Sequence, residues 1–344
     1  MANSDRPHVA IVGATGLVGE TFINILEERD FSMSSLTLMA SARSAGKRLK
    51  AMGDEFEVVE ATPDAFEDID IALFSAGGGT SKQLAPEAAK RGAVVVDNSS
   101  AWRMDANTPL VVPEVNPDDA LNHNGIIANP NCSTIQMVVA LWPLHRENPI
   151  KRIIVDTYQS ASGAGRLALE EMLEQSRGVL NGEEAQPSAF PHRIAFNAIP
   201  QIDVFEEDDY TKEEIKMVRE TQKIMHAPEI AVSATCVRIP AAFAHSEAVH
   251  VEFMNPISPS DARDILSAAP GVIVTDDPAN SAYPMAIDAQ GRDEVFVGRI
   301  RRDTALDNGL SMWVVSDNIR KGAATNTIQI AELLAKNAPV AAGR

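Results

Sequence analysis

The chain has 344 residues, only two cysteines, fewer basic than acidic residues, and no long apolar run. Two cysteines cannot form a disulfide framework, so we expect a reducing compartment, the cytoplasm. No stretch reaches the ~18 apolar residues that span a bilayer, and the first residues lack the basic and apolar regions of a signal peptide. The net charge of −18 argues against nucleic acid and anionic membranes as partners.

A length of 344 residues predicts two domains. Up to about Leu144, short apolar strands alternate with helices, which indicates a parallel α/β sheet. Strands are expected within 8–12, 35–41, 69–79, 93–100 and 125–130. Beyond this point the strands are longer and partly alternating, as in "RIIVDTYQS" and "LSMWVVSDN", which predicts a mixed sheet. The last segment, "KGAATNTIQIAELLAKNA", is expected to be a helix that packs on the first domain.

The first strand runs into a glycine cluster, "GATGLVG", with Gly13, Gly16 and Gly19. Glycines at a strand-to-helix turn let the backbone approach a pyrophosphate, whose charge the helix N-terminus favours. The spacing is G-x-x-G-x-x-G, whereas the commonest dinucleotide fingerprint is G-x-G-x-x-G. The alternative is a tight turn that binds no ligand.

The end of the second strand distinguishes NAD from NADP. An NAD site usually carries an acidic residue there, which holds the ribose 2′-hydroxyl. Here no Asp or Glu lies between Asp30 and Asp54, and the segment instead contains basic and hydroxyl side chains: Ser41, Arg43, Ser44 and Lys47. These suit a 2′-phosphate, so we expect NADP. The alternative is a solvated basic loop.

Cys132 lies where a strand, "GIIANP", meets a helix. The unpaired N–H groups of a helix N-terminus lower the pKa of a thiol from its usual value of about 8.5. The carboxyl edge of an open α/β sheet is also where such folds bind ligands. We therefore expect Cys132 to be a nucleophile and Cys236, inside the strand "AVSATCVRIP", to be a small buried hydrophobe.

A thiolate beside a nicotinamide indicates covalent aldehyde chemistry, in which a hemithioacetal gives hydride to NADP and leaves a thioester. The reaction needs a base, for which histidine is the usual choice. The spacing does not choose among the seven histidines: His8, His123, His145, His192, His226, His245 and His250. His245 follows a strand exit, with Arg238 seven residues upstream.

Ten blocks in order along nearly the whole chain resemble the aspartate-semialdehyde dehydrogenases. They include "VGATGLVG", "SARSAGK", "FSAGGG", "DNSSAWRM", "NPNCSTIQ", "TYQSASGAG", "VRIPAAFAHSE" and "DNIRKGAATNTIQIAE". The resemblance is greatest to the branch common in Gram-positive bacteria and actinobacteria. It implies NADPH-dependent reduction of L-4-aspartyl phosphate to L-aspartate 4-semialdehyde with release of phosphate. This reaction serves lysine (through diaminopimelate), threonine and methionine biosynthesis.

The resemblance also implies roles for individual residues. Cys132 would carry the aspartyl thioester, His245 would be the general acid and base, and Gln159 would orient the substrate. The other substrate contacts would be Arg238 with the α-carboxylate, Glu213 with the amino group, and Arg103, Asn131 and Lys216 with the phosphate. The residues expected to bind NADP are Gly13, Thr15, Gly16, Leu17, Val18, Ser41, Arg43, Ser44, Ser75, Ala76, Gly77, Ser162, Gly163 and Asn318.

The basic residues have a simpler interpretation. Arg103, Arg238 and Lys216 could form surface salt bridges, the common fate of basic side chains. Glu213 and Lys216 are three residues apart on a predicted helix, where an i,i+3 ion pair is the simplest expectation.

Two other functions compete. N-acetyl-γ-glutamyl-phosphate reductase has the same chemistry, but we expect a glycine after "NP" and an aromatic residue after the cysteine there, where this chain has Asn131 and Ser133. A non-catalytic NADP-binding protein would not need Cys132, Gln159 and His245 together.

We therefore predict an α/β protein with a Rossmann-like NADP-binding domain and an α+β catalytic and dimerisation domain built on a mixed sheet. The first comprises residues 1–132 with the C-terminal helix 321–344, and the second comprises residues 133–320. The second sheet is too apolar on both faces for one helix layer to cover, so we expect a homodimer. We expect small-molecule substrates and no metal.

Overall fold

The computed structural model describes residues 6–337. The chain divides into two compact units, Met1–Pro130 with Ala323–Arg344, and Asn131–Gly322. The division falls at 130/131 and 322/323, close to the expected positions at 132/133 and 320/321. The parts of the predicted first domain that comprise residues 1–5 and 338–344 lie outside the described residues.

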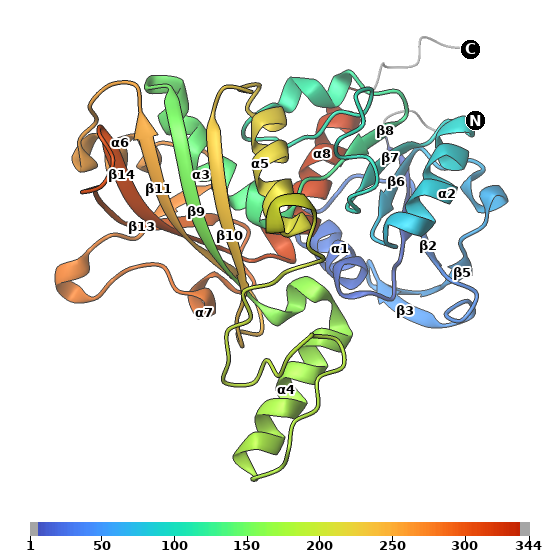
Figure 1. The fold of residues 1–344 in the computed structure, drawn as a ribbon. Coiled ribbons are helices and arrows are strands. Elements are labelled where there is room, and N and C mark those ends of the chain that lie inside the picture. Colours follow the sequence, from blue (N-terminus) through green and yellow to red (C-terminus); the bar gives the residue numbers. More distant parts are fainter. Residues whose placement is uncertain (1–5, 338–344) are drawn as a thin grey trace. The chain divides into compact units, whose positions relative to one another are not determined.

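The first unit contains a parallel six-stranded sheet in the order β5-β2-β1-β6-β7-β8 (Figure 1). Its strands are β1 (His8–Val12), β2 (Ser35–Ala40), β5 (Val59–Glu60), β6 (Ile71–Phe74), β7 (Val94–Asp97) and β8 (Ile126–Ala128). The chain runs outward from β1 to β5 and then returns to continue from β6 on the other side. The switch point between β1 and β6 is where folds of this kind bind ligands, at the carboxyl ends of the strands.

Helices cover both faces of this sheet, as the apolar strands require. One layer of the core holds Val9 and Ile11 of β1 together with apolar side chains of α1 (Leu17–Glu28) and α8 (Thr325–Asn337). The other holds Ala10 and Val12 of β1 with side chains of α2 (Gly78–Lys90). The strand β1 is therefore buried on both faces, and its carboxyl end lies in the middle of the sheet edge.

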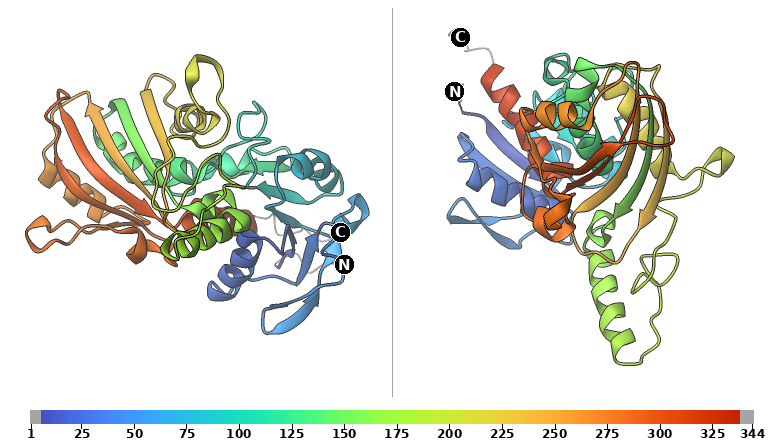
Figure 2. Two further views of the ribbon diagram at one scale, coloured as in Figure 1. Left: turned by 60° about the horizontal axis from the view of Figure 1, so that its bottom comes forward. Right: turned by 90° about the vertical axis from the view of Figure 1, so that its left-hand side faces the viewer.

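The second unit contains a mixed six-stranded sheet in the order β10-β9-β11-β14-β13-β12. Its strands are β9 (Ile150–Gln159), β10 (Ala231–Arg238), β11 (His245–Phe253), β12 (Val272–Val274), β13 (Val295–Arg302) and β14 (Gly309–Ser316). The pairs β9/β10 and β12/β13 are parallel, and the other neighbours are antiparallel. The helices α3 (Cys132–Glu147), α5 (Lys212–Ile224) and α6 (Pro259–Ser267) contact this sheet (Figures 1 and 2), as does the short helix α7 (Ala286–Ala289).

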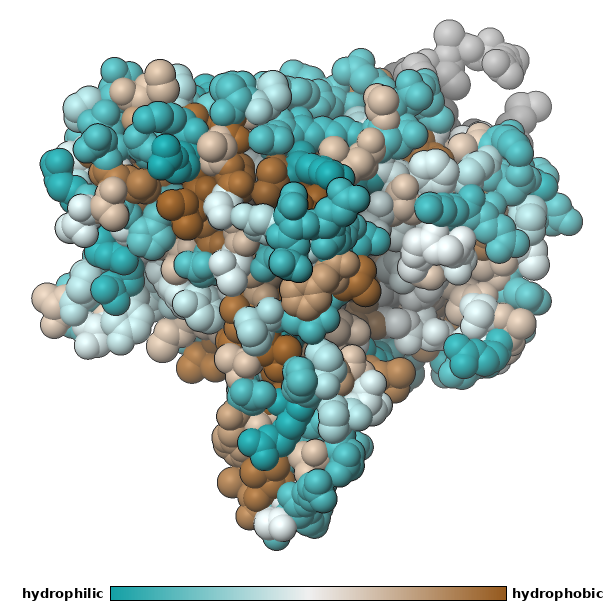
Figure 3. Space-filling model, in the orientation of Figure 1, coloured by the Kyte–Doolittle hydropathy of each residue, from teal (hydrophilic) through white to brown (hydrophobic). Residues whose placement is uncertain are grey.

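The two faces of the second sheet differ in exposure. On β9, Val155, Thr157 and Gln159 are buried, while the intervening Asp156 and Tyr158 are partly exposed. The helix α4 (Arg166–Leu180) extends away from the sheet (Figure 1). Apolar side chains lie along this arm (Figure 3), and Leu167 and Leu180 are each 76% exposed.

The predicted fold class is confirmed: a Rossmann-like unit and a unit with a mixed sheet. Several short elements are not among the predicted ones: the hairpin of β3 (Arg48–Ala51) and β4 (Asp54–Glu57), the strands β5 and β12, and the helix α7. The expected last helix is α8, which follows a π-helical turn at Arg320–Ala324 and contacts α1 and β7 of the first unit. No helix among the described residues is long and apolar enough to cross a membrane.

Candidate active site

In the first unit, the glycine cluster forms the turn from β1 to α1. Gly13 has a φ of +92°, and a Cβ there would lie 2.9 Å from the carbonyl oxygen of Ser75. Gly19 packs so closely on the turn that a Cβ there would clash with the carbonyl oxygen of Gly13. Gly16 caps α1 without a side-chain hydrogen bond. The glycines therefore bring the helix N-terminus close to the strand, as dinucleotide-binding turns require.

Two neighbouring loops meet this turn at the carboxyl edge of the sheet. After β2, the side chain of Ser44 lies 3.5 Å from the hydroxyl of Thr15, while Ser41 and Arg43 are exposed. After β6, Ser75 donates from its backbone to Val12 O at 2.8 Å, and Gly77, with φ +78°, precedes α2. The residues predicted from the first unit to bind NADP thus follow three adjacent strands.

Arg103 also belongs to the first unit but is not on its surface. It is 8% exposed, with Nε donating to Asn129 O at 3.0 Å and Nη2 to Asn98 O at 2.8 Å. The interpretation of Arg103 as a surface salt bridge is therefore wrong. The other predicted substrate-binding and catalytic residues lie in the second unit.

Cys132 is the first residue of α3 in the second unit, as the sequence predicts. Asn131 is the N-cap: its Oδ1 accepts from the backbone N–H groups of Ser133 at 3.0 Å and Thr134 at 3.1 Å. Capping satisfies the donors that a helix leaves unpaired at its start. The cap fixes the position of the thiol at the positive end of the helix dipole.

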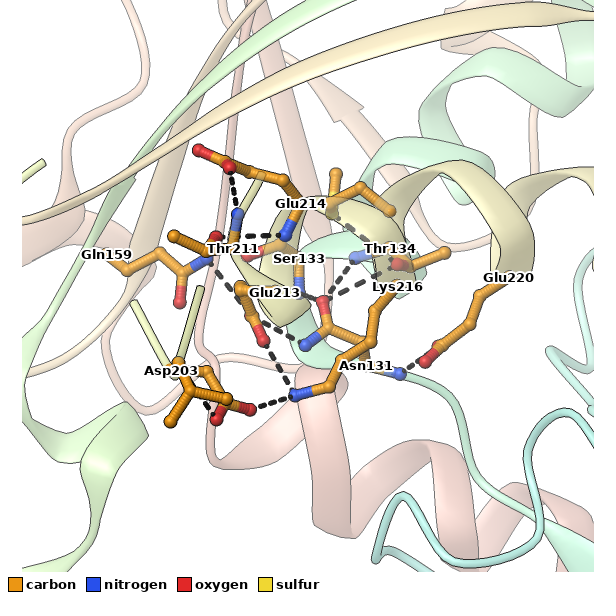
Figure 4. A network of polar contacts seen from close by, with 12 residues as sticks. Asn131, Ser133, Thr134, Gln159, Asp203, Thr211, Glu213, Glu214, Lys216 and Glu220 are labelled. Atoms are coloured by element: carbon orange, nitrogen blue, oxygen red, sulfur yellow. Dashed lines mark hydrogen bonds and ion pairs between the residues drawn. The ribbon is translucent and has the colours of Figure 1, made fainter. Parts of the chain in front are cut away.

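Glu213 joins the cap to the sheet (Figure 4). Its Oε1 accepts from Asn131 Nδ2 at 2.7 Å and from Gln159 Nε2 at 3.3 Å. Burial alone would raise the pKa of this carboxyl, but the charge of Lys216 and the hydrogen bonds from Asn131, Lys216 and Gln159 outweigh burial and lower it. Glu213 is therefore an ionised carboxylate at neutral pH.

The predicted i,i+3 ion pair of Glu213 and Lys216 is confirmed, with Lys216 Nζ 3.1 Å from Glu213 Oε2. The same ammonium lies 2.9 Å from Asp203 Oδ2. Burial would lower the pKa of Lys216, but the two carboxylates outweigh burial and raise it. Lys216 therefore stays a cation beside the Asn131 cap.

Arg238 is the last residue of β10 and is buried, with 6% exposure. Its Nη1 donates to Ser160 O at 2.7 Å. A Cβ at Gly163 would lie 2.9 Å from this Nη1 and 3.0 Å from His245 Nε2, so a larger residue there would have to displace one of the two side chains. Burial lowers the pKa of Arg238, while Glu213 and Cys132 act in the opposite direction. The interpretation of Arg238 as part of a surface salt bridge is therefore also wrong.

His245 is the first residue of β11 and is completely buried. Its Nδ1 accepts a hydrogen bond from the backbone N–H of Ser160 at 3.1 Å, and the Ser160 hydroxyl lies at the same distance. Its Nε2 has no hydrogen-bond partner among the described residues. Burial, with the charge of Arg238, lowers the pKa of His245 to about 3. The imidazole is therefore neutral and has one ring nitrogen available to a substrate.

Ser162 and Asn318, predicted to contact the cofactor, form a buried network with Ser160 in the second unit. Asn318 Oδ1 accepts from Ala244 N at 2.9 Å and from the Ser160 hydroxyl at 3.1 Å. Asn318 Nδ2 donates to Ser162 Oγ at 3.1 Å. This network connects the start of β11, which carries His245, to the segment after Gln159.

Two further residues, Ser160 and Glu220, belong to this site and are not among the predicted ones. Ser160 bonds His245, although the only sequence signal was its place beside Gln159 in "TYQSASGAG". Glu220, 1% exposed, accepts from the backbone N–H of Asn131 at 2.6 Å (Figure 4), and no sequence signal pointed to it. Cys236 is buried as predicted, and burial raises the pKa of its thiol. Among residues 6–337, no group of three or more His, Cys, Asp or Glu could hold a metal ion.

Comparisons with known proteins agree with this architecture. A family model described as semialdehyde dehydrogenase, NAD binding domain, matches residues 8–123, and one described as semialdehyde dehydrogenase, dimerisation domain, matches residues 141–321. The aspartate-semialdehyde dehydrogenase of Aquifex aeolicus is 61% identical over 333 residues, which cover 95% of this chain and 98% of the relative.

Solved structures that are similar to this chain belong to the same family. Aspartate semialdehyde dehydrogenase II of Vibrio cholerae, described as complexed with ASA, is 48% identical with a TM-score of 0.94, over 96% of this chain and 99% of that one. The Candida albicans enzyme, described as solved with NADP, is 28% identical with a TM-score of 0.74, over 96% and 99% of the two chains. These relatives favour the aspartate-semialdehyde dehydrogenases over the two alternatives, an N-acetyl-γ-glutamyl-phosphate reductase and a non-catalytic NADP-binding protein. The branch within the family stays a prediction.

Proposed function

The chain belongs to the aspartate-semialdehyde dehydrogenase family, and we propose that it reduces L-4-aspartyl phosphate to L-aspartate 4-semialdehyde with NADPH, reversibly, through a thioester on Cys132. This reaction would serve lysine, threonine and methionine biosynthesis. One observation supports the proposal most: Cys132 at the capped start of α3, with Gln159, Glu213, Arg238 and His245 as a connected group in one unit.

The proposed first step is attack of the Cys132 thiolate on the acyl phosphate. The helix N-terminus and the nearby guanidinium of Arg238 both favour the thiolate. A carbon–sulfur bond forms, the bond from that carbon to the phosphate oxygen breaks, and phosphate leaves with the electron pair. Asn131, Lys216 and Arg103 are the residues that we expect to hold the phosphate.

The proposed substrate contacts follow from charge. A buried guanidinium suits the α-carboxylate, which it can bind through two parallel hydrogen bonds, so we assign this contact to Arg238. Glu213 keeps its negative charge because its pKa is lowered, which suits the substrate ammonium group. Gln159, 1% exposed and bonded to Glu213, would orient the reacting carbonyl.

The three loops of the first unit suit NADP. The glycine turn leaves the N–H groups of α1 open to a pyrophosphate, and Arg43 and Ser44 supply a cation and a hydroxyl for a 2′-phosphate. When bound, NADPH supplies the hydride that reduces the thioester. His245 would take the thiol proton of Cys132 as the thiolate forms, give it to the oxygen of the tetrahedral adduct, and take it back as the aldehyde forms and the thiolate leaves.

The proposal includes the two predicted domains, with the first binding NADP and the second binding substrate. It also includes a homodimer, which the exposed apolar side chains of the α4 arm, such as Leu167 and Leu180, support. A cytoplasmic location is part of the proposal because a chain with two cysteines suits a reducing compartment.

The test is an NADPH-forming assay with L-aspartate 4-semialdehyde, NADP and phosphate, with arsenate replacing phosphate to make the reaction irreversible. We expect phosphate-dependent activity in the wild type and its loss in Cys132→Ala. Cys236→Ala is the matched control, since this second thiol is buried and held protonated, and it should retain activity. Full activity in Cys132→Ala would contradict the covalent mechanism, and a silent wild type would contradict the substrate.

A further inference from the structure

The ammonium of Lys216 is shared by two carboxylates (Figure 4). Its Nζ donates to Asp203 Oδ2 at 2.9 Å and to Glu213 Oε2 at 3.1 Å. An ammonium has three donors, so two of the three are bonded to carboxylates. One positive and two negative charges leave a net negative charge at this point. This charge opposes the binding of phosphate, the anion that we expect Lys216 to hold.

Asp203 is an ionised carboxylate at neutral pH. Partial burial would raise its pKa, but the hydrogen bond and charge of Lys216, the backbone N–H of Val204 and the charge of Lys212 outweigh burial and lower it. Lys212 is the first residue of α5, one turn before Lys216. A second cation is therefore close enough to act on the Asp203 carboxylate.

The two carboxylates are held differently. Glu213 is 5% exposed, and its Oε1 accepts from Asn131 at 2.7 Å and from Gln159 at 3.3 Å. The Asp203 side chain is 34% exposed, and its Oδ1 accepts from the backbone N–H of the next residue at 2.9 Å. Glu213 is therefore fixed within the site, whereas Asp203 can give up Lys216 and keep its bond to the neighbouring backbone.

We propose that Asp203 and phosphate compete for the ammonium of Lys216, so that Asp203 sets the affinity of the site for phosphate. The carboxylate gives up Nζ for phosphate to bind and regains it when phosphate leaves. This exchange breaks one ion pair and forms another, and no covalent bond changes. In the direction of aspartyl phosphate reduction, the returning carboxylate favours release of phosphate. The inference rests on the proposed function, in which Lys216 binds phosphate.

The test variant is Asp203→Asn. Asparagine keeps a side-chain oxygen that can accept from the backbone N–H of Val204, and it tolerates the φ of +68° that Asp203 adopts, but it carries no charge. Asp208→Asn is the matched control. Asp208 lies five residues further along with a φ of +63°, is exposed, and forms no ion pair within residues 6–337. Both variants therefore change the net charge equally.

The first measurement is the KM for phosphate in the oxidation of L-aspartate 4-semialdehyde with NADP. A partly exposed ion pair changes an equilibrium constant on the order of threefold, so Asp203→Asn should lower this KM about threefold. The KM values for the semialdehyde and NADP should stay nearly unchanged, and Asp208→Asn should match the wild type. A purely structural role of Asp203 would instead raise the KM for phosphate or lower kcat.

Two results of this assay would overturn the proposal. One is an unchanged or higher KM for phosphate in Asp203→Asn. The other is an equal fall of the KM in Asp208→Asn, which would mean that net charge alone is responsible.

The second measurement does not depend on activity. Inorganic phosphate is titrated with wild type and both variants at constant ionic strength, and its binding is followed by the broadening of its ³¹P NMR line. The Kd should be about threefold lower for Asp203→Asn than for the other two proteins. Equal Kd values, or no binding to any of the three, would overturn the proposal. If the protein has no dehydrogenase activity, the proposed function fails, whereas this titration still decides whether Asp203 opposes phosphate.

Discussion

Gly322 lies directly against Cys132: a Cβ on Gly322 would be 2.8 Å from the cysteine Cβ and 3.3 Å from its Cα. Gly322 ends the second unit and donates from its backbone to Asp317 O at 3.0 Å. The position of the proposed nucleophile therefore depends on a residue 190 positions away in sequence that has no side chain.

Gly322→Ala should consequently displace Cys132. A displacement of about 1 Å at a reacting group can cost roughly a hundredfold in rate, so we expect kcat to fall by that order while the thiol remains open to alkylation. The matched control is Gly79→Ala on α2, an exposed position where a Cβ meets nothing within 4 Å. Equal activity of the two variants would show that Cys132 tolerates the contact.

Arg43 should decide the preference for NADPH over NADH. It is exposed after β2, where an acidic residue would favour NAD. We expect Arg43→Ala to raise the KM for NADPH about tenfold and to leave the KM for NADH nearly unchanged. Arg48→Ala is the control, since Arg48 is an exposed cation of the same region that pairs with Glu55 at 3.3 Å. An unchanged ratio of kcat/KM for the two cofactors in Arg43→Ala would contradict the role of this loop.

The buried neutral His245 should make the fold less stable in acid. Its pKa falls from 6.5 to about 3 on folding, mainly through burial. Between these values the unfolded chain binds the proton more readily, so this contribution to stability is complete above pH 6.5 and is lost as the pH falls toward 3. Urea unfolding of wild type and His245→Gln should show a free-energy difference that declines as the pH falls from 7 to 5. A constant difference would mean that His245 is not buried in its neutral form.

Glu247 should show the opposite dependence. Both its carboxyl oxygens are buried without a hydrogen-bond partner among the described residues, and burial raises its pKa well above 4.5. The folded chain therefore holds the proton of Glu247 more tightly than the unfolded chain does. The resulting contribution to folding stability is complete below pH 4.5 and is lost as the pH rises through the pKa of Glu247 in the folded state. Glu247→Gln should become more stable relative to wild type with rising pH.

Glu252→Gln on the same strand is the control for Glu247. Its carboxylate pairs with Lys151 at 2.8 Å, and this hydrogen bond lowers its pKa. The ionised Glu252 carboxylate therefore contributes to folding stability above pH 4.5. For this reason Glu252→Gln should become less stable relative to wild type with rising pH. The same trend in both variants would contradict the assignment of Glu247 as a protonated buried acid.

Much of the fold could be predicted because its signals are local. The turn after β1 needs glycines at Gly13 and Gly19 for close backbone packing, and this requirement is visible in seven consecutive residues. Cys132 at a helix start and the Glu213–Lys216 pair also follow from local spacing. The hairpin β3–β4 is not predictable in this way, because its strands have only four residues each and lack an apolar run.

The connections within the site depend on contacts distant in sequence. Ser160 and His245 are 85 residues apart, and Asn131 and Glu213 are 82 apart. Strand periodicity places Glu247 on the same face as His245, but it does not show that helices cover that face or that the carboxyl lacks a partner. Arg238 is a further example, because its Nη1 donates to the carbonyl oxygen of Ser160, which is 78 residues away in sequence.

The most direct test of the account is to trap the acyl group on the enzyme. Wild-type protein should be mixed with L-aspartate 4-semialdehyde and NADP without phosphate, quenched in acid, and analysed by peptide mass spectrometry. The account predicts one equivalent of NADPH per active site and an aspartyl adduct on the peptide that contains Cys132, with none on the peptide of Cys236. NADPH formation without an adduct, or an adduct on another residue, would contradict the account.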